Sequence, residues 1–147
     1  MSNTFKLSLK ANEKIYLNGA VVRFDRKVTM ELLNDVQFLL ESHVLQPEDA
    51  STPLKQLYFI LQVMLMNPQG APEARDMFRR SLPLMLASFK DERIRNPLKQ
   101  VDRMVGEDNV FEALKTIRSL YAFEREALQQ NDDDEMGEVR PLAVGAR

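Results

Sequence analysis

The sequence predicts an α+β protein, in which a small N-terminal antiparallel β-sheet (about residues 4–32) packs on a C-terminal bundle of four to five α-helices (residues 34–130). Apolar and polar residues alternate near the N-terminus, an Asn-Gly pair separates two strand-like runs, and apolar residues later recur at helical spacing. The chain has 147 residues and 44% of them are apolar, which suits one domain with a buried core. We expect that domain to cover residues 1–130.

The first element is a β-hairpin. Residues 5–9 read FKLSL, which alternates as a half-buried strand does. The next two runs, residues 14–17 and 20–24, meet at Asn18-Gly19, a pair suited to a type I′ turn because both turn positions need positive φ. This turn pairs Lys14 with Arg23, Ile15 with Val22, Tyr16 with Val21, and Leu17 with Ala20. One face of the hairpin is therefore apolar, and we expect it to close against the helices.

The next residues are harder to assign. Val28 to Leu32 also alternate, and either a further strand or the approach to a helix fits them. From about Asn34 the spacing becomes helical, so we expect a helix there. Its apolar face would consist of Val36, Leu39, Leu40 and Val44.

Thr52-Pro53 marks a strong helix start, with Thr52 as the N-cap. The run that follows, residues 57–66, has ten apolar-rich residues, whereas a bilayer span needs about twenty. A helix that is apolar nearly all round is typical of a central position in a bundle. We therefore expect a buried helix and no membrane role.

Prolines divide the remaining helices. The helix from about Pro72 should kink or restart near Ser81, because Pro83 lacks a backbone N–H. Asn96-Pro97 predicts another start, and the last helix should begin at Asp108 or Asn109. The acidic residues 131–147 predict a disordered tail.

Composition limits the chemistry. Without cysteine the chain has neither disulfides nor thiolate metal sites, which suits a cytoplasmic protein. The one histidine, His43, should lie near the end of a helix, where the dipole favours an imidazolium. No phosphate loop, zinc motif or nucleophile elbow occurs. We expect no catalytic residues, no metal and no cofactor, and hence no enzyme.

Charge is unevenly distributed. Residues 1–30 hold six basic and two acidic residues, a net of +4, against −2 for the whole chain. The candidate RNA-binding residues are Lys6, Lys10, Lys14, Tyr16, Arg23, Arg26 and Lys27. One interpretation is an ordinary solvated sheet face. The other is a surface on which the cations track phosphates and Tyr16 stacks on an unpaired base.

Two other features leave alternatives open. A second basic zone, Arg75 to Arg103, fits either a salt-bridged outer helix face or an extension of a phosphate-binding surface. The eight methionines fit either an irregular core or an adaptable groove for a partner.

A family resemblance favours the RNA interpretation. Residues 9–44, LKANEKIYLNGAVVRFDRKVTMELLNDVQFLLESHV, followed by TPLKQLYFILQVML, residues 52–65, resemble the FlbT flagellum-biosynthesis regulators of alphaproteobacteria. The resemblance implies a post-transcriptional repressor that associates with the 5′ untranslated leader of flagellin mRNA and promotes its degradation, although some members activate. It also implies a small FlaF-type partner.

Two functions are therefore expected as alternatives. The first is an RNA-binding regulator of flagellin mRNA that uses the basic sheet face. The second is an adaptor or chaperone-like module that binds flagellin or a FlaF-type partner through the helical bundle. Open sheet edges would also allow a homo-oligomer.

Overall fold

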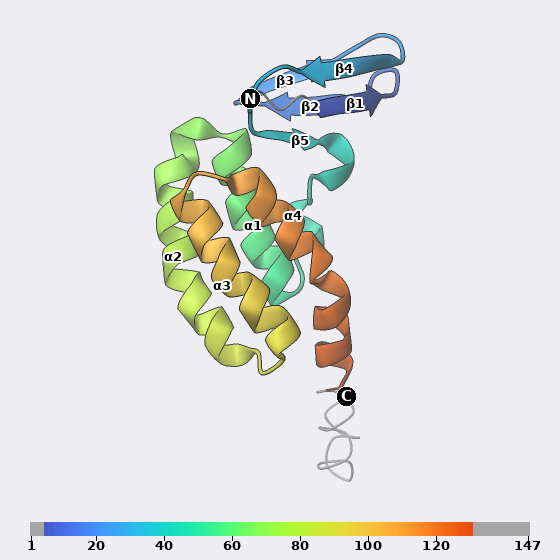
Figure 1. The fold of residues 1–147 in the computed structure, drawn as a ribbon. Coiled ribbons are helices and arrows are strands. Elements are labelled where there is room, and N and C mark those ends of the chain that lie inside the picture. The colour runs from blue at the N-terminus through green and yellow to red at the C-terminus, as the bar shows by residue number, and fades with distance from the viewer. Residues whose placement is uncertain (1–4, 131–147) are drawn as a thin grey trace.

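The computed structural model describes residues 5–130, and Figure 1 shows their strands gathered at one end of a helical bundle. The predicted α+β class is confirmed. The strands are β1 (Phe5–Leu9), β2 (Lys14–Leu17), β3 (Ala20–Arg23), β4 (Val28–Leu32) and β5 (Phe38–Leu40). The helices are α1 (Pro53–Met66), α2 (Ala71–Ser88), α3 (Glu92–Gly106) and α4 (Val110–Ser119), followed by a helical segment over residues 121–130. The tail predicted for residues 131–147 lies outside the described residues.

Strands β1 to β4 form one long hairpin that is folded back on itself. The β1–β4 and β2–β3 ladders share one register, because the residue numbers of each pair add up to 37. Examples are Phe5 with Leu32 and Lys14 with Arg23. The predicted turn is confirmed, since Asn18 and Gly19 have φ of 49° and 88°. The hairpin bends at residues 10–13 and 24–27, and both bends lie at the same end of the strands in Figure 1.

The fold-back turns one predicted sheet into two small ones. β1 pairs with β4, while β2 lies between β3 and β5. The apolar face of each half of the hairpin encloses a separate small core, which includes Leu7, Leu9, Ile15 and Phe38. We expected this face to close against the helices, and that expectation is wrong because the hairpin buries the face mainly against itself.

The expected helix from Asn34 is also wrong. The segment forms β5, a 3-10 turn over Glu41–His43 and irregular structure. Leu39 and Leu40 point to opposite sides of a strand, so Leu39 enters the helical core while Leu40 joins the small core. The apolar spacing that indicated one helical face serves two cores instead.

In the bundle, α1 is central, as predicted, and packs against both α2 and α4. Thr52 accepts a hydrogen bond from the backbone N–H of Lys55 (3.3 Å), which confirms it as the N-cap. Helix α2 continues through Pro83, so the restart that was one of the two alternatives near Ser81 does not occur. The start expected at Asn96-Pro97 is wrong, because α3 begins at Glu92, where Asp91 supplies the cap.

Polar and apolar contacts join the strand region to the bundle. The side-chain amide of Gln37 donates to the carbonyl of Asp108 and accepts from the backbone N–H of Phe111 (2.7 Å). At the hairpin tip, a Cβ placed on Gly19 would lie 3.0 Å from Cγ of Pro68, in the turn between α1 and α2. The strand region is therefore held to the bundle at the hairpin tip and at the residue before β5.

Candidate nucleic-acid interface

All six basic residues predicted for the site are exposed: Lys6, Lys10, Lys14, Arg23, Arg26 and Lys27. The structure does not place them on one flat sheet. Lys6 lies on β1 in the outer half of the hairpin, whereas Lys14 and Arg23 pair with each other in the inner half. Because β1 pairs with β4 and does not join the β2–β3 sheet, the six cations follow the bend of the hairpin.

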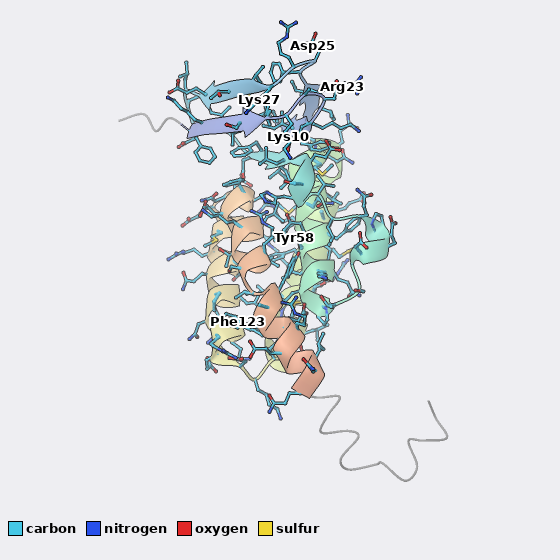
Figure 2. The ribbon with its side chains drawn as sticks, turned by 90° about the vertical axis from the view of Figure 1, so that its right-hand side faces the viewer. Lys10, Arg23, Asp25, Lys27, Tyr58 and Phe123 are labelled. Atoms are coloured by element: carbon cyan, nitrogen blue, oxygen red, sulfur yellow. The ribbon has the colours of Figure 1, made fainter. Side chains whose placement is uncertain are left out.

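Five of the six lie within or directly beside the two chain segments at which the hairpin bends. We call this group the basic bend: Lys10, Lys14, Arg23, Arg26 and Lys27. Residues 10–14 and 23–27 hold these five bases and two acids, a net charge of +3. In Figure 2 the labelled Lys10, Arg23 and Lys27 lie among the strands at the upper end of the molecule. An exposed cluster of this kind attracts phosphate groups.

Three carboxylates lie at the bend and offset part of its charge. Asp25 and Glu13 belong to the bend. Glu41, just after β5, accepts a hydrogen bond from the backbone N–H of Lys14 (2.8 Å). The Arg26 guanidinium hydrogen-bonds the Asp25 carboxylate (3.0 Å), which lowers the pKa of Asp25. Both side chains are largely exposed, so this pair contributes little to stability. Glu13 accepts from the backbone N–H of Lys10 (2.9 Å), which fixes the chain at the bend rather than the lysine side chain.

Tyr16 is not the exposed ring that we expected. It lies beside Leu39 in the ladder, on the side of the sheet that faces the helices, and packs against the main core. The predicted stacking of Tyr16 on a base therefore has no support in this geometry. The sequence pattern placed Tyr16 on the polar face of the hairpin, but it could not show that helices cover this part of the face.

The outer face also carries an acid that the predicted site omitted. Glu31 lies opposite Lys6 in the β1–β4 ladder, and both are exposed. Ser8 and Thr29 form the next pair of the same face along the strands. The outer half is thus less basic than the bend. The position of Glu31 opposite Lys6 follows from the β1–β4 register, which the sequence did not reveal.

Three arginines of the second basic zone have structural contacts. Arg75 donates to the carbonyl of Val105 (2.8 Å) near the end of α3, and Arg95 donates to carbonyls at the end of α2. Arg93 pairs with Asp91 (2.8 Å) and lies over the ring of Phe123 (4.4 Å). These contacts satisfy helix ends and favour the structural interpretation for these three residues.

His43 also departs from expectation. It lies in the 3-10 turn beside β5, and burial together with the nearby Arg118 charge lowers its pKa. Its carbonyl accepts from the Tyr58 hydroxyl (2.6 Å), which accepts in turn from Arg118 (2.8 Å). The expected imidazolium at a helix end is therefore wrong. Among residues 5–130 no three His, Cys, Asp or Glu side chains cluster as metal ligands would.

Fold and site together define a class, a small α+β protein that presents a bent, basic hairpin beside a helical bundle. The chain belongs to the FlbT family, because the family described as "Flagellar protein FlbT" matches residues 5–128. This confirms the resemblance seen in the sequence. No helix in the described part of the chain is long and apolar enough to cross a membrane.

Curated relatives agree with this assignment. A "Probable flagellum biosynthesis repressor protein FlbT" of Mesorhizobium japonicum is 71% identical over the whole chain and 99% of its own length. Proteins of the same name are 58% identical in Chelativorans sp. strain BNC1, over 99% of each chain, and 53% identical in Rhizobium leguminosarum bv. trifolii, over 90% of this chain and 89% of the relative. No solved structure matches the chain.

Proposed function

We propose that this protein is a cytoplasmic post-transcriptional regulator of flagellum biogenesis that binds the 5′ untranslated leader of flagellin mRNA. Its relatives are named flagellum biosynthesis repressors, which supports a repressive role. The observation that carries the proposal is the basic bend, where five exposed cations lie within or beside the fold-back of the hairpin. Spaced cations on a rigid support suit the phosphates of a single strand or loop.

The mode of binding follows from the residues at the bend. With Tyr16 packed on the helical core, phosphate contacts replace stacking as the main source of affinity. We propose that the protein is not itself an enzyme, so that degradation of the bound message depends on a separate ribonuclease. The single histidine of the chain supports this view, since its lowered pKa and its place beside Tyr58 give it a structural setting.

The test is a binding titration at several salt concentrations. The probes are a flagellin leader RNA and a scrambled RNA of equal length. Each lost phosphate contact should flatten the slope of log affinity against log salt by about 0.7 for a single strand. We therefore expect Lys10→Ala with Lys27→Ala to weaken binding and to flatten the slope by about 1.4.

A matched double variant tests the second basic zone. Arg79 and Arg103 are exposed on α2 and α3, so Arg79→Ala with Arg103→Ala removes the same charge elsewhere. We expect it to leave both affinity and slope close to those of the unmodified protein. Equal losses from the two double variants, or no loss from the bend variant, would contradict the assignment of the interface to the basic bend.

A second candidate function, an adaptor for flagellin or a FlaF-type partner, is favoured by one surface of α2. Met77 and Leu84 lie two turns apart on the same side of this helix, and Leu84 is 74% exposed. Leu84→Asp should abolish capture of a purified FlaF-type protein without lowering the melting temperature, if this surface binds it. Unchanged capture would remove α2 as the docking helix.

A further inference from the structure

A cleft separates the hairpin from the helices on the side of the N-terminal strand. Its volume is about 670 Å³. One wall comes from β1 and the segment between β4 and β5, and the other from the start of α4 and the turn before it. The side chains that matter for its chemistry are Phe5, Asp35, Phe38, Glu107, Phe111 and Glu112.

The floor of this cleft is aromatic. The rings of Phe5 and Phe38 have centroids 5.5 Å apart, and those of Phe38 and Phe111 are 4.5 Å apart. Phe5 is 48% exposed at one end of this row. Phe38 is buried beneath it. The exposed part of Phe5 is thus available for apolar contact in the cleft.

The rim of the cleft is acidic. Asp35, Glu107, Asp108 and Glu112 line it, with Lys115 as the basic residue among its described lining residues, a net charge of −3. Arg75 from α2 pairs with Asp108 and offsets that one charge. Asp35 and Glu107 are exposed at the mouth. Phosphate groups would be repelled here, in contrast to the basic bend.

We propose that this cleft docks a segment of a partner protein that carries apolar side chains flanked by lysine or arginine. The aromatic floor would take the apolar side chains, since burying such surface is the main source of affinity. The rim would pair with the flanking cations, which speeds association and selects the partner. The molecule then has two interfaces of opposite charge, one suited to an RNA backbone and one to a basic segment of a protein.

The test uses three fluorescent peptides of equal length and measures their binding to the full chain by anisotropy. One alternates leucine with lysine, the second leucine with glutamate, and the third serine with lysine. We expect the leucine–lysine peptide to bind most tightly, because only this peptide supplies both apolar groups and positive charge. Its affinity should fall as salt is raised, since the rim charges are exposed.

Charge reversal at the rim locates the site. Neither Asp35 nor Glu107 makes a described side-chain hydrogen bond, and a lysine at the end of α3 suits the helix dipole. Asp35→Lys with Glu107→Lys should therefore fold normally and weaken leucine–lysine binding by about tenfold. Asp76→Lys with Asp102→Lys is the matched control, because both residues are exposed acids, on α2 and α3, that do not line the cleft.

The outcomes decide between occupants. Equal weakening by the rim variant and by the control double variant would show attraction to the whole acidic surface and would overturn the proposal. Binding of the serine–lysine peptide as tightly as the leucine–lysine peptide would also overturn it, because the aromatic floor would then contribute nothing. A rim variant that loses affinity for the leader RNA while peptide binding stays unchanged would overturn it too, because the cleft would then serve the nucleic acid.

Discussion

The carboxylate of Glu124 accepts a hydrogen bond from the backbone N–H of Leu54 (2.7 Å), although seventy positions separate the two residues. The same carboxylate accepts from the hydroxyl of Thr52 (2.5 Å), and Glu124 is only 1% exposed. A helix begins with backbone N–H groups that lack partners and with a positive dipole end. Glu124 supplies both an acceptor and a negative charge at the start of the central helix α1.

We predict that Glu124→Ala lowers the free energy of unfolding by about 2–3 kcal/mol, because it leaves buried donors unpaired. Glu124→Gln should cost less, since the amide oxygen can still accept one of the two hydrogen bonds. Urea denaturation followed by circular dichroism measures both. Glu126→Ala is the control, as Glu126 is exposed and its ion pair with Arg93 is long (3.7 Å). A loss at Glu126 as large as at Glu124 would contradict the capping role.

The tip of the hairpin gives a second prediction. Gly19 has φ of +88°, and a Cβ there would approach Pro68 to 3.0 Å. We expect Gly19→Ala to destabilise the protein by about 1–2 kcal/mol, through backbone strain and loss of the tip contact. Gly106→Ala is the matched substitution, because a Cβ at Gly106 meets nothing within 4 Å. Thermal denaturation should show a lower melting temperature for the first variant alone.

The hairpin tip and the start of α1 show which features can be predicted from the sequence. Asn18-Gly19 determines a two-residue turn through local backbone preference, and from it the pairing of Lys14 with Arg23 follows directly. Likewise, Thr52 and Pro53 are read as a cap because capping involves neighbours in the chain. Glu124 shares that helix start but lies far along the sequence, and its spacing gives no sign of the role.

The candidate interface was predictable only in part, because contacts between residues distant in the sequence decide its shape. The six cations are visible in the sequence, but the bend at residues 10–13 and 24–27 decides which of them lie together. Tyr16 was misplaced because alternation identifies two faces of a strand without telling which neighbours cover each face. The cleft was missed altogether, since its walls come from residues near 35 and near 110.

His43 predicts a pH dependence of stability. Burial and the Arg118 charge lower its pKa in the folded protein below the ordinary value of 6.5. The unfolded chain therefore binds a proton more readily, and acid favours unfolding. The contribution of His43 is complete above pH 6.5 and is lost as the pH falls from 6.5 through the lower pKa of the folded state.

Urea midpoints measured at about pH 7.5 and about pH 5.5 test this dependence. The decrease between them should be smaller in His43→Gln than in the unmodified protein. Carboxylates with lowered pKa values, such as Asp25 and Asp91, titrate at lower pH and are common to both proteins. An identical decrease in the two proteins would mean that His43 has the same pKa in the folded and unfolded states, and it would contradict the prediction.

The pairing of Lys6 with Glu31 yields a prediction of tighter RNA binding. Glu31 is an exposed acid on the outer face of the hairpin, directly opposite Lys6 and on the strand that follows the basic bend. Glu31→Gln removes a charge that repels phosphates there but leaves every cation in place. We expect affinity for the flagellin leader RNA to rise about two- to fivefold at moderate salt, and the gain to shrink as salt screens it. Glu73→Gln on α2 changes the net charge of the protein equally and serves as the comparison. A gain of the same size from both substitutions would indicate a response to total charge rather than an interface along the hairpin.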